Sequence, residues 1–462
     1  MIVRRSLALV SLVAALHGLF FIWYQRTDWA TQWSDQDGYR RLGQVIAETG
    51  RFTRFPDAPQ FVPEVIRTPV YPAFVALIYR VFGVHQIPVA LAQTGLFVLI
   101  CLVVYRIARR VSDDRVAIIA ATLTALYSPL PYFGALVMTE VWTTVLFTVS
   151  MWVAIGALQD GSRGAFALLG FLLAVTTLSR PVFVLFPLAL AALGLTLWGT
   201  RVRTRPTPGH WAVMLVVFAI AMLPWLTYNY AAFGRFTLSP AGGIGRGLWE
   251  GSWQATWSGR LHNELTHLAD DIDDRAELDR RVEAIAAREH LPADPMLEYV
   301  HQWEDIRRIW TEPVDPSQRA VARVHADREY LRVAIDKIRR DPLPHLVKRL
   351  ARGVFVLWAG EIPFRYSQIN QLPPILIYAC WTVQAVLCAL AMYGVYALAR
   401  SGWLAEACLL AAPIVYITAV HVPLLKEARQ SLPAQPVLLL LVTIGVASLL
   451  PLKPQVHERE HL

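Results

Sequence analysis

The sequence is poor in charged residues and in cysteine. Only 17% of its 462 residues are charged and 55% are hydrophobic, whereas soluble domains contain roughly 25% charged residues. This shortage of charge argues against a soluble globular protein and favours a membrane protein. The cysteines all lie inside apolar runs, which argues against a disulfide framework or a cysteine-bound metal cluster. They are Cys101, Cys380, Cys388 and Cys408.

Motifs of several common functional classes are also missing. The chain has no zinc-ligand spacing and no Ser-His-Asp arrangement. The glycine-rich stretch 242–247 follows an apolar run instead of a strand, so it indicates a flexible turn and not a dinucleotide site. A net charge of +8 would suit nucleic acid, but the basic tracts lie beside apolar runs. We therefore predict no nucleic-acid partner and a lipid bilayer around the chain.

Ten apolar runs are candidates for membrane spans, because about 20 apolar residues cross a bilayer. They are residues 6–24, 87–106, 115–131, 137–158, 165–179, 181–199, 210–230, 375–399, 403–422 and 433–451. The first run follows Arg4 and Arg5 but has no persuasive small-x-small cleavage site, so we expect a retained span and not a signal peptide. The pattern predicts an all-α polytopic membrane protein with about ten, and up to twelve, transmembrane helices.

The basic tracts orient these spans, because lysine and arginine are enriched in short cytoplasmic loops. Tracts 106–110 and 201–205 both lie inside when the first span runs outward, which predicts that both termini are cytoplasmic. The apolar run 70–84 is short for a span, and counting it as one would move tract 106–110 outside. We therefore expect residues 70–84 to form an external helix that dips into the membrane interface.

This topology divides the chain into three predicted parts. Residues 1–233 form an N-terminal transmembrane module, and its first external loop, 25–86, contains juxtamembrane helices. Residues 234–345 form a small, mostly helical external (periplasmic) segment. Residues 346–462 comprise an interfacial helix followed by the C-terminal transmembrane helices. The polar residues that could carry chemistry therefore gather on the outer face.

The first external loop contains two carboxylates, Asp35 and Asp37, ahead of an amphipathic stretch that includes Tyr39. A carboxylate in the first turn of a helix is favoured by the helix dipole. Either aspartate could therefore be a helix cap or a member of a functional site.

Four further charged residues lie at predicted outer membrane boundaries. Arg67 precedes Pro69 and could bind an anionic ligand or anchor the chain at lipid headgroups. Glu140 opens a span, a position at which acidic residues are often functional. Lys426 and Arg429 come just before the final span, where positive charge runs against the usual bias and invites a functional explanation.

Together, these stretches resemble the polytopic GT-C glycosyltransferases, which use lipid-linked sugars, and especially the branch of protein O-mannosyltransferases and aminoarabinose transferases. The resemblance covers most of the chain and rests on the order of several short motifs. They are Asp35-x-x-x-Tyr39, Arg67-x-Pro-x-Tyr-Pro72, Thr139-Glu140, Ser179-Arg-Pro181, Pro224-Trp225 to Asn229-Tyr230, and Arg429-x-x-Leu-Pro433.

The resemblance implies an inverting hexosyl- or pentosyltransferase that moves a sugar from a polyprenyl-phosphate donor to an acceptor. Asp35 matches the catalytic base of the class, and Arg67 and Arg429 would bind the donor phosphate. Tyr39, Glu140 and Lys426 would support the site or the acceptor.

Two features leave alternatives open. Several relatives have adjacent acidic residues in the first loop, whereas Gln36 here separates Asp35 from Asp37, so Asp37 remains a second candidate for the base. No cofactor is required by the pattern. A divalent cation held by Asp35, Asp37 and Glu140 is an open alternative, because carboxylate oxygens suit such ions.

The main functional alternative is a transporter or flippase for a lipid-linked or anionic substrate, and a third is a non-catalytic assembly partner. Transporters usually place polar residues near the midplane of the membrane, whereas the polar residues here gather on one face. We therefore favour an enzyme of the plasma (inner) membrane with its active site on the external, periplasmic face. The sequence identifies neither the sugar nor the acceptor, which could be a protein, a lipid or a glycan.

Overall fold

The computed structural model describes residues 2–26, 34–197, 206–254, 256–360, 372–424 and 427–450. Within these ranges the chain is helical and contains no strand. Seven helices are long and apolar enough to cross a membrane. They are α1 (Ile2–Gln25), α4 (Gln86–Val111), α7 (Thr139–Asp160), α10 (Pro208–Phe233), α18 (Pro374–Arg400), α19 (Leu404–His421), and η3 (Ala428–Ala434) together with α20 (Gln435–Leu449). The prediction of an all-α polytopic membrane protein is confirmed.

The three remaining predicted spans are shorter helices. Run 115–131 corresponds to α5 (Asp114–Leu126) and the first part of α6 (Pro129–Gly134). Run 165–179 corresponds to α8 (Arg163–Thr177), and run 181–199 to η1 (Pro181–Leu185) followed by α9 (Phe186–Thr196). Each of the ten predicted runs is therefore mostly helical where the structure describes it, although the number that cross a membrane stays a prediction.

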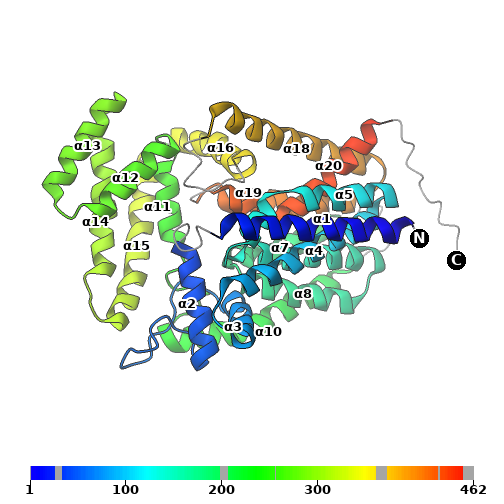
Figure 1. Ribbon diagram of the computed structural model, residues 1–462, viewed down its shortest axis with the longest axis horizontal. Coiled ribbons are helices and arrows are strands. Elements are labelled where there is room, and N and C mark those ends of the chain that lie inside the picture. The colour runs from blue at the N-terminus through cyan, green and yellow to red at the C-terminus, as the bar shows by residue number, and fades with distance from the viewer. Residues whose placement is uncertain are drawn as a thin grey trace.

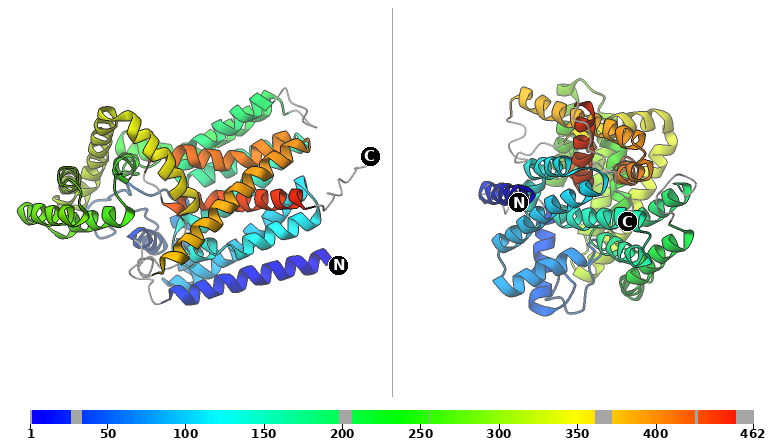
Figure 2. Two further views of the ribbon diagram at one scale, coloured as in Figure 1. Left: turned by 90° about the horizontal axis from the view of Figure 1, so that it is seen from above. Right: turned by 90° about the vertical axis from the view of Figure 1, so that its right-hand side faces the viewer.

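The long helices pack side by side as a bundle, with a separate group of helices at one end (Figures 1 and 2). The beginning of α1 and the end of α20 both lie at the opposite end of the bundle (Figure 2). This arrangement agrees with a chain whose two ends share one side of a membrane and whose segment 234–345 lies on the other. Which side is cytoplasmic stays a prediction.

Helix α7 lies inside the bundle and is mostly buried, as are η3 and α20. Two of its buried threonines bond within the helix: the hydroxyl of Thr144 donates to the carbonyl of Glu140 at 2.7 Å, and that of Thr148 to the carbonyl of Thr144 at 2.7 Å. Such internal bonds let polar side chains lie where no water is available. The start of α7 is therefore a rigid support for Glu140.

Five helices form the group at the end of the bundle, which we call the external unit after its predicted position. They are α11 (Ile244–Gln254), α12 (Gly259–Asp271), α13 (Arg275–Glu289), α14 (Asp294–Thr311) and α15 (Pro316–Arg340). The unit has its own apolar core, in which the Trp249 ring stacks on Tyr299 at 5.1 Å and on Trp303 at 5.7 Å. Large buried aromatic rings stabilise a small unit because each removes a large apolar area from water.

Three further helices lie between the bundle and the external unit or beside the bundle. Helices α2 (Ser34–Thr49) and α3 (Val70–Phe82) pack against each other, and a Cβ at Gly43 would lie 2.5 Å from Val75 Cγ1. Helix α16 (Pro342–Ala359) follows the external unit and exposes large apolar side chains such as Leu343 and Val347. An apolar exposed face suits the predicted position of α16 at a membrane surface.

Candidate active site

A polar cavity of about 100 Å³ lies at the end of the bundle where α2, α7 and η3 meet. Its walls come from five separate stretches of the chain. They are Asp35, Tyr39, Ile66, Arg67, Thr68, Met138, Thr139, Glu140, Ser179, Arg180, Pro181 and Arg429. A concave site lined by converging charged groups is the usual form of a binding or catalytic site.

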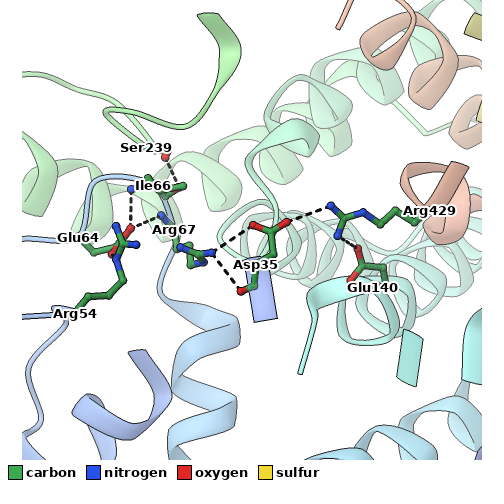
Figure 3. Close-up of polar contacts among 8 residues, drawn as sticks. All are labelled: Asp35, Arg54, Glu64, Ile66, Arg67, Glu140, Ser239 and Arg429. Atoms are coloured by element: carbon green, nitrogen blue, oxygen red, sulfur yellow. Dashed lines mark hydrogen bonds and ion pairs between the residues drawn. The ribbon is translucent and has the colours of Figure 1, made fainter. Parts of the chain in front are cut away.

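Asp35 lies in the first turn of α2, between two arginines (Figure 3). Its Oδ1 is 3.3 Å from Arg67 Nη2, and its Oδ2 is 3.1 Å from Arg429 Nη2. Arg67 Nη2 also donates to the backbone carbonyl of Asp35 at 3.2 Å. One carboxylate therefore connects two guanidinium groups that are 362 positions apart in the sequence, from 67 to 429.

Arg429 is the hub of this network. Its side chain is 13% exposed, and its Nη1 donates to Glu140 Oε1 at 3.3 Å. Its Nε also donates to the carboxylate of Glu427, two residues earlier. Glu140, in the first turn of α7, is only 1% exposed. The structure thus brings together the predicted residues Asp35, Glu140 and Arg429 from three distant segments.

Tyr39 and Gly38 define the position of the Arg67 side chain. The Arg67 guanidinium carbon lies 4.7 Å from the centre of the Tyr39 ring, within range of a cation–π interaction. The Tyr39 ring in turn meets Tyr71 edge-on at 5.0 Å. A Cβ on Gly38 would lie 2.2 Å from the same guanidinium carbon, so only glycine leaves room for Arg67 here.

Asp37 does not line the described cavity. The Asp37 side chain is 67% exposed and forms an ion pair with Arg40 at 3.7 Å, one turn along α2. Lys426 lies outside the described residues. The geometry therefore favours Asp35 over Asp37 as the carboxylate that belongs to the site.

The two arginines keep Asp35 ionised. Burial alone would raise the pKa of the Asp35 carboxyl, but the charges of Arg429 and Arg67 outweigh burial and hold its pKa below the usual aspartate range. Burial raises the pKa of the Tyr39 phenol, which therefore stays protonated at neutral pH. The cavity thus presents one exposed face of a carboxylate among guanidinium groups.

Arg180 is a cavity residue that the candidates from the sequence omit. It lies between α8 and η1, and its Nη2 is 3.8 Å from Glu140 Oε1. Arg180 Nη1 and Glu140 Oε2 are buried and have no hydrogen-bond partner among the described residues. The motif Ser179-Arg180-Pro181 contributes to the family resemblance, and Arg180 also has a signal of its own, because a charged side chain between two apolar runs is a common mark of function.

These residues do not fit a divalent cation. No group of three histidine, cysteine or acidic side chains is placed to hold a metal within the described ranges. Asp35 and Glu140 are each paired with Arg429, and Asp37 points away. Three arginines and two carboxylates line the cavity, which suits an anion instead.

Comparisons with known proteins bear on this site. Residues 66–228, about a third of the chain, match the family described as dolichyl-phosphate-mannose-protein mannosyltransferase. The matched stretch contains Arg67, Glu140 and Arg180, whereas Asp35 and Arg429 lie outside it. No curated protein sequence matched the chain.

The solved structures that resemble the chain include the archaeal oligosaccharyltransferase AglB from Archaeoglobus fulgidus. AglB in complex with an inhibitory peptide and a dolichol-phosphate matches with a TM-score of 0.50 and 15% identity over 96% of this chain. The apo form of the same enzyme matches with a TM-score of 0.52 and 13% identity, also over 96% of this chain. The fold is the GT-C fold. The resemblance seen in the sequence is thereby confirmed, and the chain is an integral membrane protein of this fold.

The GT-C match has a clear limit in length. The chain spans about half the length of the AglB structures, 50% in both cases. ArnT from Cupriavidus metallidurans bound to undecaprenyl phosphate also matches, with a TM-score of 0.40 and 14% identity over 95% of this chain and 77% of that one.

Proposed function

We propose that the protein is an inverting glycosyltransferase of the plasma (inner) membrane. It moves a sugar from a polyprenyl-phosphate donor to an acceptor on the outer face. The single observation that carries this proposal is the position of Asp35 between Arg67 and Arg429 in a cavity of a GT-C fold. The structurally similar AglB was solved with a dolichol-phosphate, which is a lipid phosphate of this kind.

The arginines of the cavity bind the donor phosphate in this proposal. Guanidinium groups match phosphate geometry and keep their charge when buried. Arg67, Arg429 and Arg180 lie at the cavity, and the last has a buried donor with no partner among the described residues. The phosphate is the leaving group and accepts negative charge as the bond to the sugar breaks. Fixed cations stabilise that charge, so no general acid is needed.

Asp35 acts as the general base. The acceptor hydroxyl oxygen bonds to the anomeric carbon, the bond from that carbon to the phosphate oxygen breaks, and its electron pair leaves with the phosphate. The hydroxyl proton passes to the Asp35 carboxylate. Attack opposite the leaving group inverts the anomeric centre. Asp37 stays the second candidate for this role.

The two roles are coupled through the same arginines. Arg429 and Arg67 lower the pKa of Asp35 against the effect of its burial, so by itself the carboxylate is a weak base. A donor phosphate that takes up part of the arginine charge raises the basicity of Asp35. Proton transfer is then favoured only when the donor is bound, which links the chemistry to donor occupancy.

A transporter or flippase fits the charges less well. The charged groups lie at helix ends: Asp35 and Glu140 in the first turns of α2 and α7, and Arg180 between α8 and η1. Alternating access usually needs a polar site near the middle of the bundle. The external unit lies beside this end of the bundle (Figure 1). In this proposal it helps to select the acceptor.

The experiment is a release assay with purified protein in detergent. The protein receives polyprenyl-phosphate donors carrying different sugars together with an extract of surface glycans and proteins. We expect acceptor-dependent release of free polyprenyl phosphate and an inverted linkage in the product. The matched control is the Arg67→Ala/Arg429→Ala double variant, which should release none.

A different outcome contradicts the proposal. If the protein moves lipid-linked sugar across vesicle membranes and never releases polyprenyl phosphate, it is a transporter. If the protein does release polyprenyl phosphate, mass spectrometry of surface glycans and glycoproteins from a deletion strain identifies the sugar and the acceptor.

A further inference from the structure

We propose that Glu64 is a positioning residue for Arg67. This inference rests on the proposed role of Arg67 in binding the donor phosphate. Glu64 does not line the cavity, and it acts through the backbone that carries Arg67.

The Glu64 carboxylate is buried and shared among three donors. Its side chain is 1% exposed, and its Oε2 is 2.6 Å from Arg54 Nε. Its Oε1 accepts the backbone N–H of Ile66 at 2.9 Å and that of Arg67 at 3.2 Å (Figure 3). A buried carboxylate is stable only when such donors surround it.

These bonds fix the backbone at Arg67 in one direction. Two successive N–H groups must point to the same oxygen, so the peptide planes of residues 66 and 67 are held together. The loop between α2 and α3 has no helix or strand around this point. Without the Glu64 carboxylate, the orientation of the backbone would depend on weaker contacts.

The opposite edge of the same segment is tied to the chain that leads to the external unit. The Ser239 hydroxyl donates to the carbonyl of Ile66, and the Ala241 N–H donates to the carbonyl of Val65 at 2.8 Å. Val65 and Ala241 also share a small apolar cluster. N–H groups on one edge and carbonyls on the other are therefore both occupied, which leaves residues 65–67 little freedom.

The Arg67 side chain has a narrow place to occupy beyond this backbone. It must pass Gly38, lie over Tyr39 and reach Asp35 Oδ1 at 3.3 Å. A long side chain can meet such a target only if its Cα is fixed, since a misplacement of about 1 Å can strongly reduce the function of a site. Glu64 supplies that fixed point.

The test measures binding of a polyprenyl phosphate to the full-length protein in detergent. Glu64→Ala should weaken binding about tenfold, which corresponds to loss of one charge-assisted interaction. In an Arg67→Ala background, Glu64→Ala should cause no further loss, because it acts through Arg67. Glu64→Gln should stay within about threefold of the wild type, because its amide oxygen can still accept both N–H groups.

The control is Asp57→Asn in the same loop. The Asp57 side chain is 96% exposed, and its ion pair with Arg41 is long, at 4.0 Å. This variant should bind like the wild type. If Glu64→Ala does not yield folded protein, Ser239→Ala tests the opposite edge, with a smaller loss that should again vanish in the Arg67→Ala background.

Any of three results would overturn the role of Glu64 and leave the proposed function standing. They are wild-type binding by Glu64→Ala, an equal loss of binding with and without Arg67, or equal losses of binding for the alanine and glutamine variants. The second of these describes a purely structural carboxylate. If instead the wild-type protein binds no polyprenyl phosphate, the proposed function fails, and the inference fails with it. The two failures are therefore distinguishable.

Discussion

The cavity and the external unit use the same charged residue types in opposite ways. In the external unit, ion pairs join neighbours on one helix or on adjacent helices, as in Arg281–Glu277 at 2.8 Å with side chains 64% and 31% exposed. In the cavity, Arg429 joins Asp35 and Glu140, which are 394 and 289 positions away. The Arg429–Glu140 pair is buried, with side chains 13% and 1% exposed, whereas the Asp35 side chain is 49% exposed toward the cavity.

The difference shows where charge carries function. An exposed pair contributes about 0–1 kcal/mol because water and salt screen it. Removing one partner of a buried pair costs about 3–5 kcal/mol because the other charge remains desolvated. Buried charges destabilise the fold unless they are paired, so groups with perturbed pKa values are concentrated at functional sites.

The largest expected effect comes from the two aspartates of α2. Asp35→Asn should lower turnover by about 10²–10⁴-fold, because the amide cannot accept the acceptor proton. Asp37→Asn should change turnover by less than about threefold, since its side chain is 67% exposed and faces away from the cavity. Turnover of both variants is measured by polyprenyl phosphate release. The reverse order would make Asp37 the base.

Arg429→Met should reduce turnover by about 10²–10³-fold, the size of effect seen when one donor to a developing negative charge is removed. It should also alter the pH profile. Arg429 is the main charge that lowers the pKa of Asp35 against its burial, so without it that pKa rises. Asp35 then becomes protonated at a higher pH, so the acid limb of the pH profile of kcat/KM should shift to higher pH. An unchanged acid limb would show that Arg429 does not control the protonation of Asp35.

Arg180→Met should reduce turnover by about tenfold, because Arg180 lies at the cavity but pairs with Glu140 only at 3.8 Å. Arg180→Lys should recover only part of that loss, since an ammonium group cannot match the planar guanidinium. Steady-state kinetics against donor concentration measure both. Wild-type kinetics for Arg180→Met would leave Arg67 and Arg429 as the phosphate ligands.

The smallest effect is expected in the external unit. The hydrogen bond from Arg288 is the main cause that lowers the pKa of Glu264. This pair therefore stabilises the fold above the ordinary glutamate pKa of about 4.3, and its contribution is lost as the pH falls through the lower folded-state value. Arg288→Met should lower the melting temperature only slightly at neutral pH, because water and salt screen an exposed ion pair. Thermal melting measures this, and transfer activity should not change.

Part of the site could be predicted from the sequence because it lies at recognisable boundaries. Arg67 precedes a proline at a helix start, Glu140 opens a span and Arg429 precedes the last one. Arg180 has a weaker signal, a charged side chain between two apolar runs. Glu64 has no such signal, because it matters only through backbone groups that fold against it.

The sequence by itself determined the helical membrane architecture, because a helix needs about 20 consecutive apolar residues to cross a bilayer, and such runs can be read directly from the sequence. Through the family resemblance it also limited the candidates for the proposed base to Asp35 and Asp37. Two residues along a helix turn the side chain by about 200°, so the two carboxylates face different sides of α2. Only the tertiary structure decided which side meets the cavity, because the arginines that surround Asp35 come from segments 32 and 394 positions away.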